Sequence, residues 1–297
     1  MGQGIIKISD PRYPALLKKI STDVPRQLYY KGEWREDIFQ NCLAVVGSRR
    51  MTTYGKQITE KLVSEIAGRG VTIVSGFMYG IDATAHKAAV DIGGKTIAVM
   101  PCGIELVHPE NQVKLYDEIL ENKGLIISEY KGNLLPVNWT YPRRNRIVAG
   151  LARAVMVVEA GERSGSLITA NFARKFKRKI FAVPGPLTSI LSKGINQLIK
   201  EGAGVVTDAE DILEFFRKCS KPSFAQSCAK LGFERSRGQA PMSSLEQKII
   251  QQLQKESMEI DFLARNLAIS VSETGRALSM MEIKRLIFSE NGKYYIK

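Results

Sequence analysis

Short runs of β-branched and aliphatic residues alternate with helix-length segments through the middle of this chain. The runs lie at 43–46, 71–74, 96–100, 125–127, 154–158, 179–183 and 205–206, and amphipathic segments at 54–67, 82–89, 112–121 and 167–175 separate most of them. Strands that alternate with helices pair in parallel, and strands that are apolar throughout are buried on both faces. The sequence therefore predicts an α/β domain with an extended, Rossmann-like, doubly wound and mostly parallel sheet.

The chain divides into four predicted regions. Residues 1–38 contain Pro11, Pro14 and Pro25, which argue against long regular elements, so we expect an N-terminal arm that packs on the main domain. The Rossmann-like domain covers 39–216. The stretch 217–242 is polar, contains Gly and Pro, and is typical of a flexible linker. Residues 243–297 form a separate small domain.

The pattern of this last region indicates a winged helix. Ser244 and Gln247 form a capping box before an apolar helix, and further helices are predicted at 260–267 and 271–281. Strands at 286–288 and 293–296 flank an Asn-Gly pair that favours a hairpin turn. The third helix carries Arg276 but also Glu273, so DNA binding and protein interaction both stay open as its role.

The loops that follow the predicted strands form the candidate site, because ligands of such sheets bind outside the carboxyl ends of the strands. These loops lie at 47–50, 75–82, 101–104, 161–166 and 184–186, and several combine Gly with Ser, Arg or Asp. Glycine lets main-chain N–H groups approach a phosphate, and the N-terminus of a following helix favours an anion. We therefore expect an anion-binding cleft. The sequence has neither GxGxxG after the first strand nor GxxxxGK[ST], which argues against a dinucleotide site and a P-loop.

Positive charge is concentrated beside one of these loops. The chain has a net charge of +13 and an isoelectric point near 9.5, which favours a polyanionic partner. Residues 141–200 hold 12 Lys and Arg against 2 Asp and Glu. In this block Tyr141 adjoins the cationic run 143–146, and a Gly/Ser loop follows the strand at 154–158. Arginines beside an aromatic ring suit an extended nucleic-acid strand, although a solvated basic face is the plainer alternative.

The cysteines and histidines argue against a metal site. Four cysteines and two histidines are scattered without CxxC or another metal-ligand spacing. Scattered cysteines are also typical of a reducing compartment. The sequence shows no apolar leader and no membrane-length apolar run, so we expect a cytoplasmic protein without a membrane partner.

Many of these loops also carry motifs of a known family. They include Val-Gly-Ser-Arg at 46–49, Gly-Ile-Asp at 80–82, Pro-Arg-Arg-Asn-Arg-Ile at 142–147, Ser-Gly-Ser-Leu-Ile-Thr-Ala at 164–170, Phe-Ala-Val-Pro-Gly at 181–185 and Gly-Ile-Asn at 194–196. With these pieces in order from about residue 10 to residue 214, the chain resembles the DNA-processing protein A family, also called DprA or Smf. The terminal winged helix resembles the one that many members carry.

The resemblance implies a function and a set of site residues. It implies an extended Rossmann fold that binds single-stranded DNA, usually as a homodimer, and loads the RecA recombinase onto incoming strands in natural transformation. It implies no catalysis and no cofactor. By motif, the first loop should hold phosphate, the run 143–146 should line the same groove, and the Gly/Ser loop should form its floor. The DNA-binding residues that we predict are Gly47, Ser48, Arg49, Arg50, Tyr141, Arg143, Arg144, Asn145, Arg146, Ser164, Gly165 and Ser166.

The chain departs from the family pattern in three places. Tyr79 stands where the family usually has Arg, so a phosphate contact is lost or replaced by stacking. His108 stands where a Tyr is usual. Many members carry an N-terminal helical module; because this sequence begins close to the Tyr-Pro motif at 13–14, we expect it to hold none.

Two alternatives accompany the DNA-binding hypothesis. A nucleotide-binding or nucleotide-hydrolysing protein on the same fold would use Glu159 or Asp82 as its acid, although single carboxylates at strand ends are usually structural. An interaction module would instead dock the basic face on an acidic protein, such as RecA or a second copy of the chain. That reading is compatible with DNA binding.

Overall fold

The computed structural model describes residues 2–20, 23–219, 244–253, 258–267, 269–283, 287–290 and 293–296. The chain divides into two compact units, residues 1–219 and 220–297. The predicted linker 217–242 falls almost entirely outside the described residues. The boundaries of the predicted domains therefore stay predictions.

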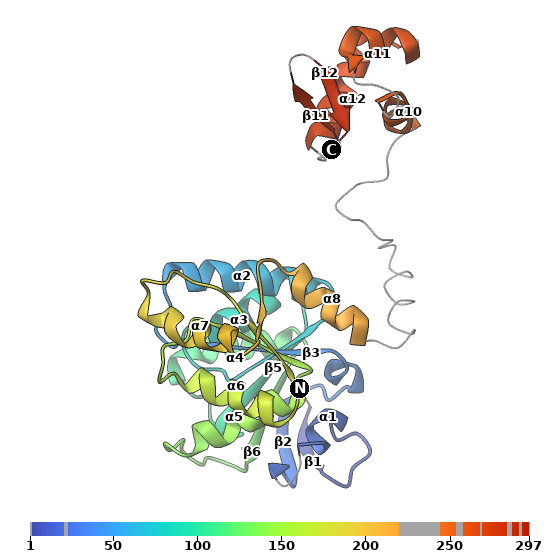
Figure 1. Ribbon diagram of the computed structural model, residues 1–297. Helices are drawn as coiled ribbons and strands as arrows, with labels where there is room; N and C mark the ends of the chain where they lie inside the picture. The colour runs from blue at the N-terminus through green and yellow to red at the C-terminus, as the bar shows by residue number, and fades with distance from the viewer. Residues whose placement is uncertain are drawn as a thin grey trace. The chain divides into compact units, whose positions relative to one another are not determined.

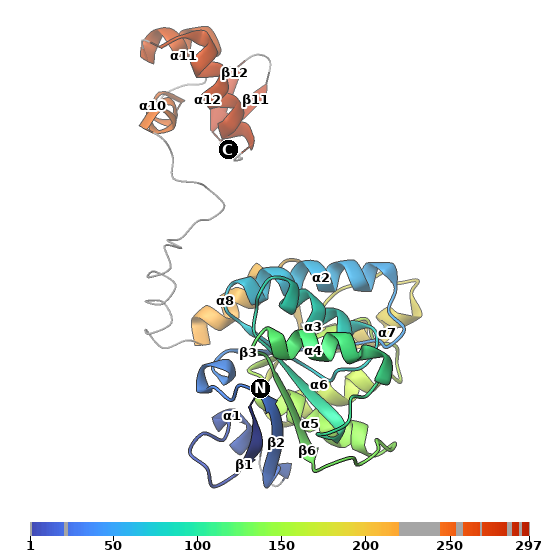
Figure 2. The same cartoon turned by 180° about the vertical axis from the view of Figure 1, so that it is seen from behind.

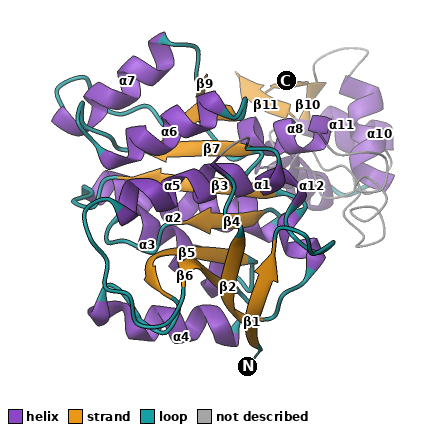
Figure 3. Cartoon of the chain, turned by 90° about the horizontal axis from the view of Figure 1, so that it is seen from below, coloured by secondary structure: helices purple, strands orange, loops and turns teal. Residues whose placement is uncertain are grey.

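A nine-stranded sheet forms the centre of the first unit, in the order β1-β2-β6-β5-β4-β3-β7-β8-β9 (Figure 3). The strands are β1 (Gln3–Lys7), β2 (Gln27–Gly32), β3 (Cys42–Gly47), β4 (Thr72–Ser75), β5 (Thr96–Gly103), β6 (Leu125–Tyr130), β7 (Ala154–Val158), β8 (Lys179–Ala182) and β9 (Gly204–Val205). The seven strands β3 to β9 pair in parallel. In contrast, β1 and β2 are antiparallel to their neighbours. This confirms the predicted fold class.

The N-terminal residues belong to the sheet itself. We expected an arm without long regular elements, but β1 pairs with β2, and β2 pairs with β6 in the register Tyr29↔Ser128. The prolines do not prevent this, because Pro11, Pro14 and Pro25 lie in the connection between the two strands, where no ladder hydrogen bond is needed. The arm therefore continues the sheet beyond β6.

Helices cover both faces of the sheet (Figures 1 and 2). They are α1 (Ala15–Lys18), α2 (Thr53–Gly68), α3 (Ile81–Asp91), α4 (Val113–Glu121), α5 (Thr140–Leu151), α6 (Gly165–Lys175), α7 (Lys193–Lys200) and α8 (Glu210–Cys219). Alternate residues of each strand face opposite layers: Ala44 and Val46 join the core under α1, α5, α6 and α7, whereas Leu43 and Val45 join the core under α2, α3 and α8. A third cluster packs α4 against β5 and β6.

The strand order reverses at β3. The chain leaves β3 to build β4, β5 and β6 on one side, and it returns to β3's other side with β7 and β8. In doubly wound sheets the loops diverge at such a switch point and leave a crevice at the carboxyl ends of the two strands. The loops after β3 and β7 therefore diverge from each other, and a crevice is expected between them.

The second unit has the helices and strands of a winged helix. Its elements are α10 (Ser244–Leu253), β10 (Met258–Glu259), α11 (Ile260–Leu267), α12 (Val271–Ile283), β11 (Ile287–Glu290) and β12 (Lys293–Ile296). The strands pair in the order β10-β12-β11 around a core that includes Ile249, Leu263 and Leu278. The three helices and the hairpin agree with the prediction, which missed only the two-residue strand β10. The Asn-Gly turn at 291–292 and the side chains of Gln247 and Arg276 lie outside the described residues.

Candidate nucleic-acid interface

A cleft of about 990 Å³ opens at the switch point of the sheet. Its walls come from residues 46–50 after β3, residues 161–166 after β7, and Tyr141, Arg144 and Asn145 of α5, and we call it the switch-point cleft. Its volume is at the upper end of the range for small-molecule sites. The structure thus brings together the first loop, the Gly/Ser loop and part of the 141–146 run, as the sequence predicted.

Arg49 and Tyr141 meet in this cleft. The Arg49 guanidinium carbon lies 5.0 Å from the centroid of the Tyr141 ring, within the range of a cation–π contact. The Tyr141 hydroxyl is hydrogen-bonded to His108 Nε2 at 2.8 Å. His108 therefore anchors the ring, and burial lowers the pKa of its imidazole. Where His108 stands in place of the family's usual Tyr, an aromatic side chain thus keeps a defined contact.

The two loops present polar groups and helix N-termini. Ser164 is the N-cap of α6, its hydroxyl accepts from Ser166 N, and its Oγ lies 2.7 Å from Ser166 Oγ. Ser48 Oγ accepts a hydrogen bond from Arg50 N. The N-terminus of α6 carries partial positive charge and points unsatisfied N–H groups toward the cleft end of the sheet, which favours an anion.

Glycines allow the loops to pack this closely. A Cβ on Gly47 would lie 1.9 Å from the carbonyl oxygen of Val158, and a Cβ on Gly80 would lie 2.2 Å from that of Ser48. Gly80 also has a φ of 73°, which side-chain-bearing residues rarely adopt. Gly47 therefore serves the packing of β3 against β7, whatever contact its N–H makes with a ligand.

Arg144 lies at the inner end of the cleft and is 3% exposed. Its Nη1 donates to the carbonyl oxygens of Gly76 and Val99, at the ends of β4 and within β5, and its Nε donates to Asn145 Oδ1. Burial lowers the pKa of the guanidinium to about 10. A Cβ on Gly76 would lie 2.4 Å from Arg144 Nη2, so this glycine makes room for the side chain. Arg144 fixes α5 to the sheet, a role that the sequence did not indicate.

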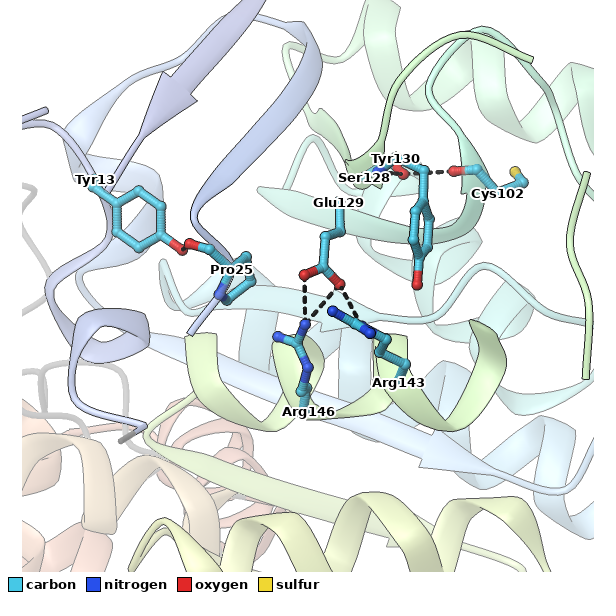
Figure 4. A network of polar contacts seen from close by, with 8 residues as sticks. All are labelled: Tyr13, Pro25, Cys102, Ser128, Glu129, Tyr130, Arg143 and Arg146. Carbon is cyan, nitrogen blue, oxygen red and sulfur yellow. Dashed lines mark hydrogen bonds and ion pairs between the residues drawn. The ribbon is translucent and has the colours of Figure 1, made fainter. Parts of the chain in front are cut away.

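Arg143 and Arg146 are not among the residues that line the switch-point cleft, and both point to Glu129 (Figure 4). The predicted run therefore does not line one cavity, and DNA binding by these two arginines stays a prediction. Arg146 Nη2 donates to both carboxylate oxygens of Glu129 at 2.6 Å, and Arg143 Nε donates to Glu129 Oε2 at 3.3 Å. Both arginines line a second cavity of about 790 Å³. The run is the start of α5, and a helix turns successive residues to different sides.

Other residues of the cleft escaped the sequence analysis. Asn138, Ile190 and Lys193 also line it, and so does Arg163, whose loop was expected there but which was not among the predicted DNA-binding residues. Lys193 and Arg163 belong to the basic block 141–200, and this charge was the feature of the sequence that could have pointed to them. Lys193 follows β8, however, and only the tertiary structure brings that segment to the cleft. Tyr79, which stands where the family usually has Arg, is 43% exposed and is not among the residues that line the cleft.

The two carboxylates that a hydrolase would use are occupied by structural contacts. Glu159 accepts from Thr52 N at 2.8 Å and from the Thr52 hydroxyl, which ties the end of β7 to the start of α2. Asp82 is buried, which raises the pKa of its carboxyl, and it accepts from Met78 N. In the described part of the chain no three His, Cys, Asp or Glu side chains gather as a metal site would require. None of the described helices combines the length and apolar character of a membrane span.

Comparisons with known proteins agree with this geometry. The sequence model of DNA recombination-mediator protein A matches residues 4–217, and that of the DprA winged helix domain matches residues 234–293. The chain is 40% identical to DNA processing protein DprA of Bacillus subtilis over 71% of each chain. It is 45% identical to protein Smf of Escherichia coli over 65% of this chain and 52% of that protein, so it spans about half the length of that relative.

Solved structures show the same relationship. DNA processing protein A of Streptococcus pneumoniae superposes with a TM-score of 0.67 and 40% identity, over 72% of this chain and 74% of that one. DNA processing protein A of Helicobacter pylori, whose structure was described for its single-stranded DNA binding mode, superposes with a TM-score of 0.65 and 30% identity, over 73% of this chain and 97% of that one. The chain belongs to the DNA recombination-mediator protein A family.

Proposed function

We propose that this protein binds single-stranded DNA in the switch-point cleft and acts as a recombination mediator. The observation that carries the proposal is the contact of Arg49 with the Tyr141 ring, 5.0 Å from guanidinium carbon to ring centroid, beside the N-terminus of α6. An exposed arginine attracts phosphate, and an aromatic face stacks on a base without reading its identity. The relative from Helicobacter pylori, described for its binding of single-stranded DNA, supports the choice of ligand.

The residues of the cleft take different parts in this proposal. Arg49, Arg50 and Lys193 supply positive charge, while the N–H groups around Ser164 and Ser166 receive phosphate oxygens. Tyr141 stacks on a base. A strand whose bases are unpaired can present both its phosphates and its base faces to such a cleft, whereas duplex DNA offers only phosphates and groove edges. We therefore expect a preference for single strands.

Salt titration tests this proposal. Fluorescence anisotropy of a labelled single-stranded oligonucleotide should show affinity that falls steeply with salt, because binding releases counterions. Arg49→Gln should weaken binding and reduce the slope of log K against log salt by about 0.7, the value for one phosphate contact on a single strand. Lys114→Gln is the matched control, since this lysine lies on α4 with its side chain 90% exposed. Salt-insensitive binding, or equal affinity for duplex, would contradict the proposal.

We extend the proposal to loading of RecA during natural transformation and to action as a homodimer, as the family membership suggests. Both are assembly functions, so they need partners that recognise this chain. Sedimentation analysis of the full chain, alone and with purified RecA and a single strand, measures both. A monomer that shows no complex with RecA on DNA would contradict this extension and leave the DNA-binding proposal standing.

Nucleotide hydrolysis has no comparable support. Its candidate acids Glu159 and Asp82 are engaged with Thr52 and Met78. We therefore propose a binding protein and no enzyme.

A further inference from the structure

A second cavity adjoins the switch-point cleft. It measures about 790 Å³, and we call it the arm pocket because residues 23–27 of the N-terminal arm form one of its walls. Arg143 and Arg146 of α5, Glu129 of β6 and Phe172 of α6 form the others. Pro142 lines both cavities, so only the first turn of α5 separates them. A flexible chain that fills one cavity can therefore continue into the other.

Both carboxylates of the arm pocket are paired, Asp23 with Lys175 at 2.7 Å and Glu129 with arginine, which leaves two arginines available to a ligand. Arg146 neutralises Glu129 by donating to both of its carboxylate oxygens at 2.6 Å. Arg143 contacts the same carboxylate only at 3.3 Å and is 54% exposed, so it can turn toward a phosphate at little cost. Arg26 is exposed and makes no ion pair within the described part of the chain.

The pocket also contains a buried donor without a partner and an aromatic wall. Arg146 is 6% exposed, and its Nη1 has no hydrogen-bond partner among the described residues. A buried donor of this kind is costly unless an acceptor reaches it. Phe172 is partly buried and stacks on Phe176, so its ring is held in place. Guanidinium groups beside a fixed ring are the components of a single-strand track.

We infer that the arm pocket takes the next nucleotides of a single strand that is bound in the switch-point cleft. The strand crosses Pro142, places phosphates at Arg143 and Arg26, and turns a base toward Phe172. This inference rests on the proposed function and deepens it, because it gives the binding site a second half. The fixed Glu129–Arg146 pair shapes the pocket, while Arg143 and Arg26 contact the DNA.

Oligonucleotide length separates the two cavities. With the full chain, anisotropy titrations over a salt series should compare single strands of about 4 and about 16 nucleotides, the limits of the site sizes of single-strand binding modules. Arg26→Gln and Arg143→Gln should each lower the salt slope for the long strand by about 0.7 and leave the short strand unchanged. Arg49→Gln should weaken the binding of both oligonucleotides. Lys61→Gln, an exposed charge on α2 at the opposite face, should change neither.

The outcomes are distinguishable. If Arg49→Gln has no effect on the short strand, the proposed cleft is wrong. If Arg49→Gln acts but Arg26→Gln and Arg143→Gln behave like Lys61→Gln on the long strand, the cleft stands and the arm pocket is not part of the DNA site. If the two arm-pocket variants instead change the oligomeric state in size-exclusion chromatography with unchanged slopes, the pocket receives a second copy of the chain, which also overturns the inference.

Discussion

The six residues from Tyr141 to Arg146 illustrate how one cationic run is divided by a helix. Tyr141 and Asn145 are four apart and face the switch-point cleft, while Arg143 and Arg146 are three apart and face Glu129. Arg144 lies between these faces and is buried. The sequence predicted that this run belongs to the site, and Tyr141, Arg144 and Asn145 do line the cleft. Which residue faces which side depends on the helical phase of the first turns of α5, which a run of adjacent cationic residues does not show.

Arg144 should matter more for stability than its neighbour. Arg144→Met would leave the carbonyl oxygens of Gly76 and Val99 without their donor, and hydrogen bonds from charged groups contribute about 1.5–3 kcal/mol each. We expect urea denaturation to show a loss of about 3 kcal/mol in the free energy of unfolding. Arg143→Met, one residue earlier and half exposed, should change it by less than about 0.5 kcal/mol. Equal effects of the two variants would show that Arg144 does not lock α5 to the sheet.

At the scale of elements, the parallel strands were predictable and the antiparallel ones were not. The strands from β3 to β9 are apolar runs bounded by loops, and their predicted positions agree with the structure within one to three residues. β1 and β2 are short and half polar, and their place depends on pairing with β6, which no local pattern shows. The cleft was predictable for a similar reason: loops after parallel strands share an edge. The contributions of Asn138 and Lys193 depend on tertiary structure alone.

A contact between α3 and β5 should make stability depend on pH. His86 on α3 is buried, and its Nδ1 lies 2.7 Å from Thr96 Oγ1 on β5. The Thr96 hydroxyl donates its hydrogen to Ile73 O, so Nδ1 donates to Thr96, while Nε2 has no hydrogen-bond partner among the described residues. Burial lowers the pKa of His86 from 6.5 to about 3.

The direction of this pH dependence follows from the protons that the folded and unfolded chains bind. Between these two pKa values the unfolded chain binds a proton that the folded chain does not, so the free energy of unfolding falls as the pH falls below 6.5. From about pH 8 to about pH 5 the expected loss is about 2 kcal/mol, at 1.36 kcal/mol per pKa unit. Denaturation of His86→Asn over the same range should show a smaller slope, whatever its absolute stability. If the dependence of the free energy of unfolding on pH is unchanged in this variant, the dependence arises from other groups, of which His108 is one.

At the scale of the whole molecule, each of the two units has a core of its own. The clusters beneath the sheet helices contain residues of the first unit, and the cluster around Ile249, Leu263 and Leu278 contains residues of the second. The switch-point cleft and the arm pocket both lie within the first unit. Single-strand binding should therefore be a property of residues 1–219.

A truncated chain tests that expectation. The protein ending at Cys219 should unfold cooperatively and should bind a single strand with the same salt slope as the full chain. A slope smaller by more than about 0.7, one phosphate contact, would show that the winged helix also holds DNA. Circular dichroism of the truncated chain is the control, because a misfolded first unit would lose affinity for DNA even if the winged helix made no contact with it.

The pairing of β2 with β6 has a consequence for synthesis. Tyr29 emerges from the ribosome about 100 residues before its partner Ser128, which at about 5–20 residues per second leaves the β6-facing edge of β2 unpaired for about 5–20 s. During that interval Leu28 and Tyr29, which are buried in the finished protein, are exposed to other nascent chains. Until β6 has been made, β2 can pair only with β1, so the edge of β2 that β6 later covers stays open to pairing with strands of other chains.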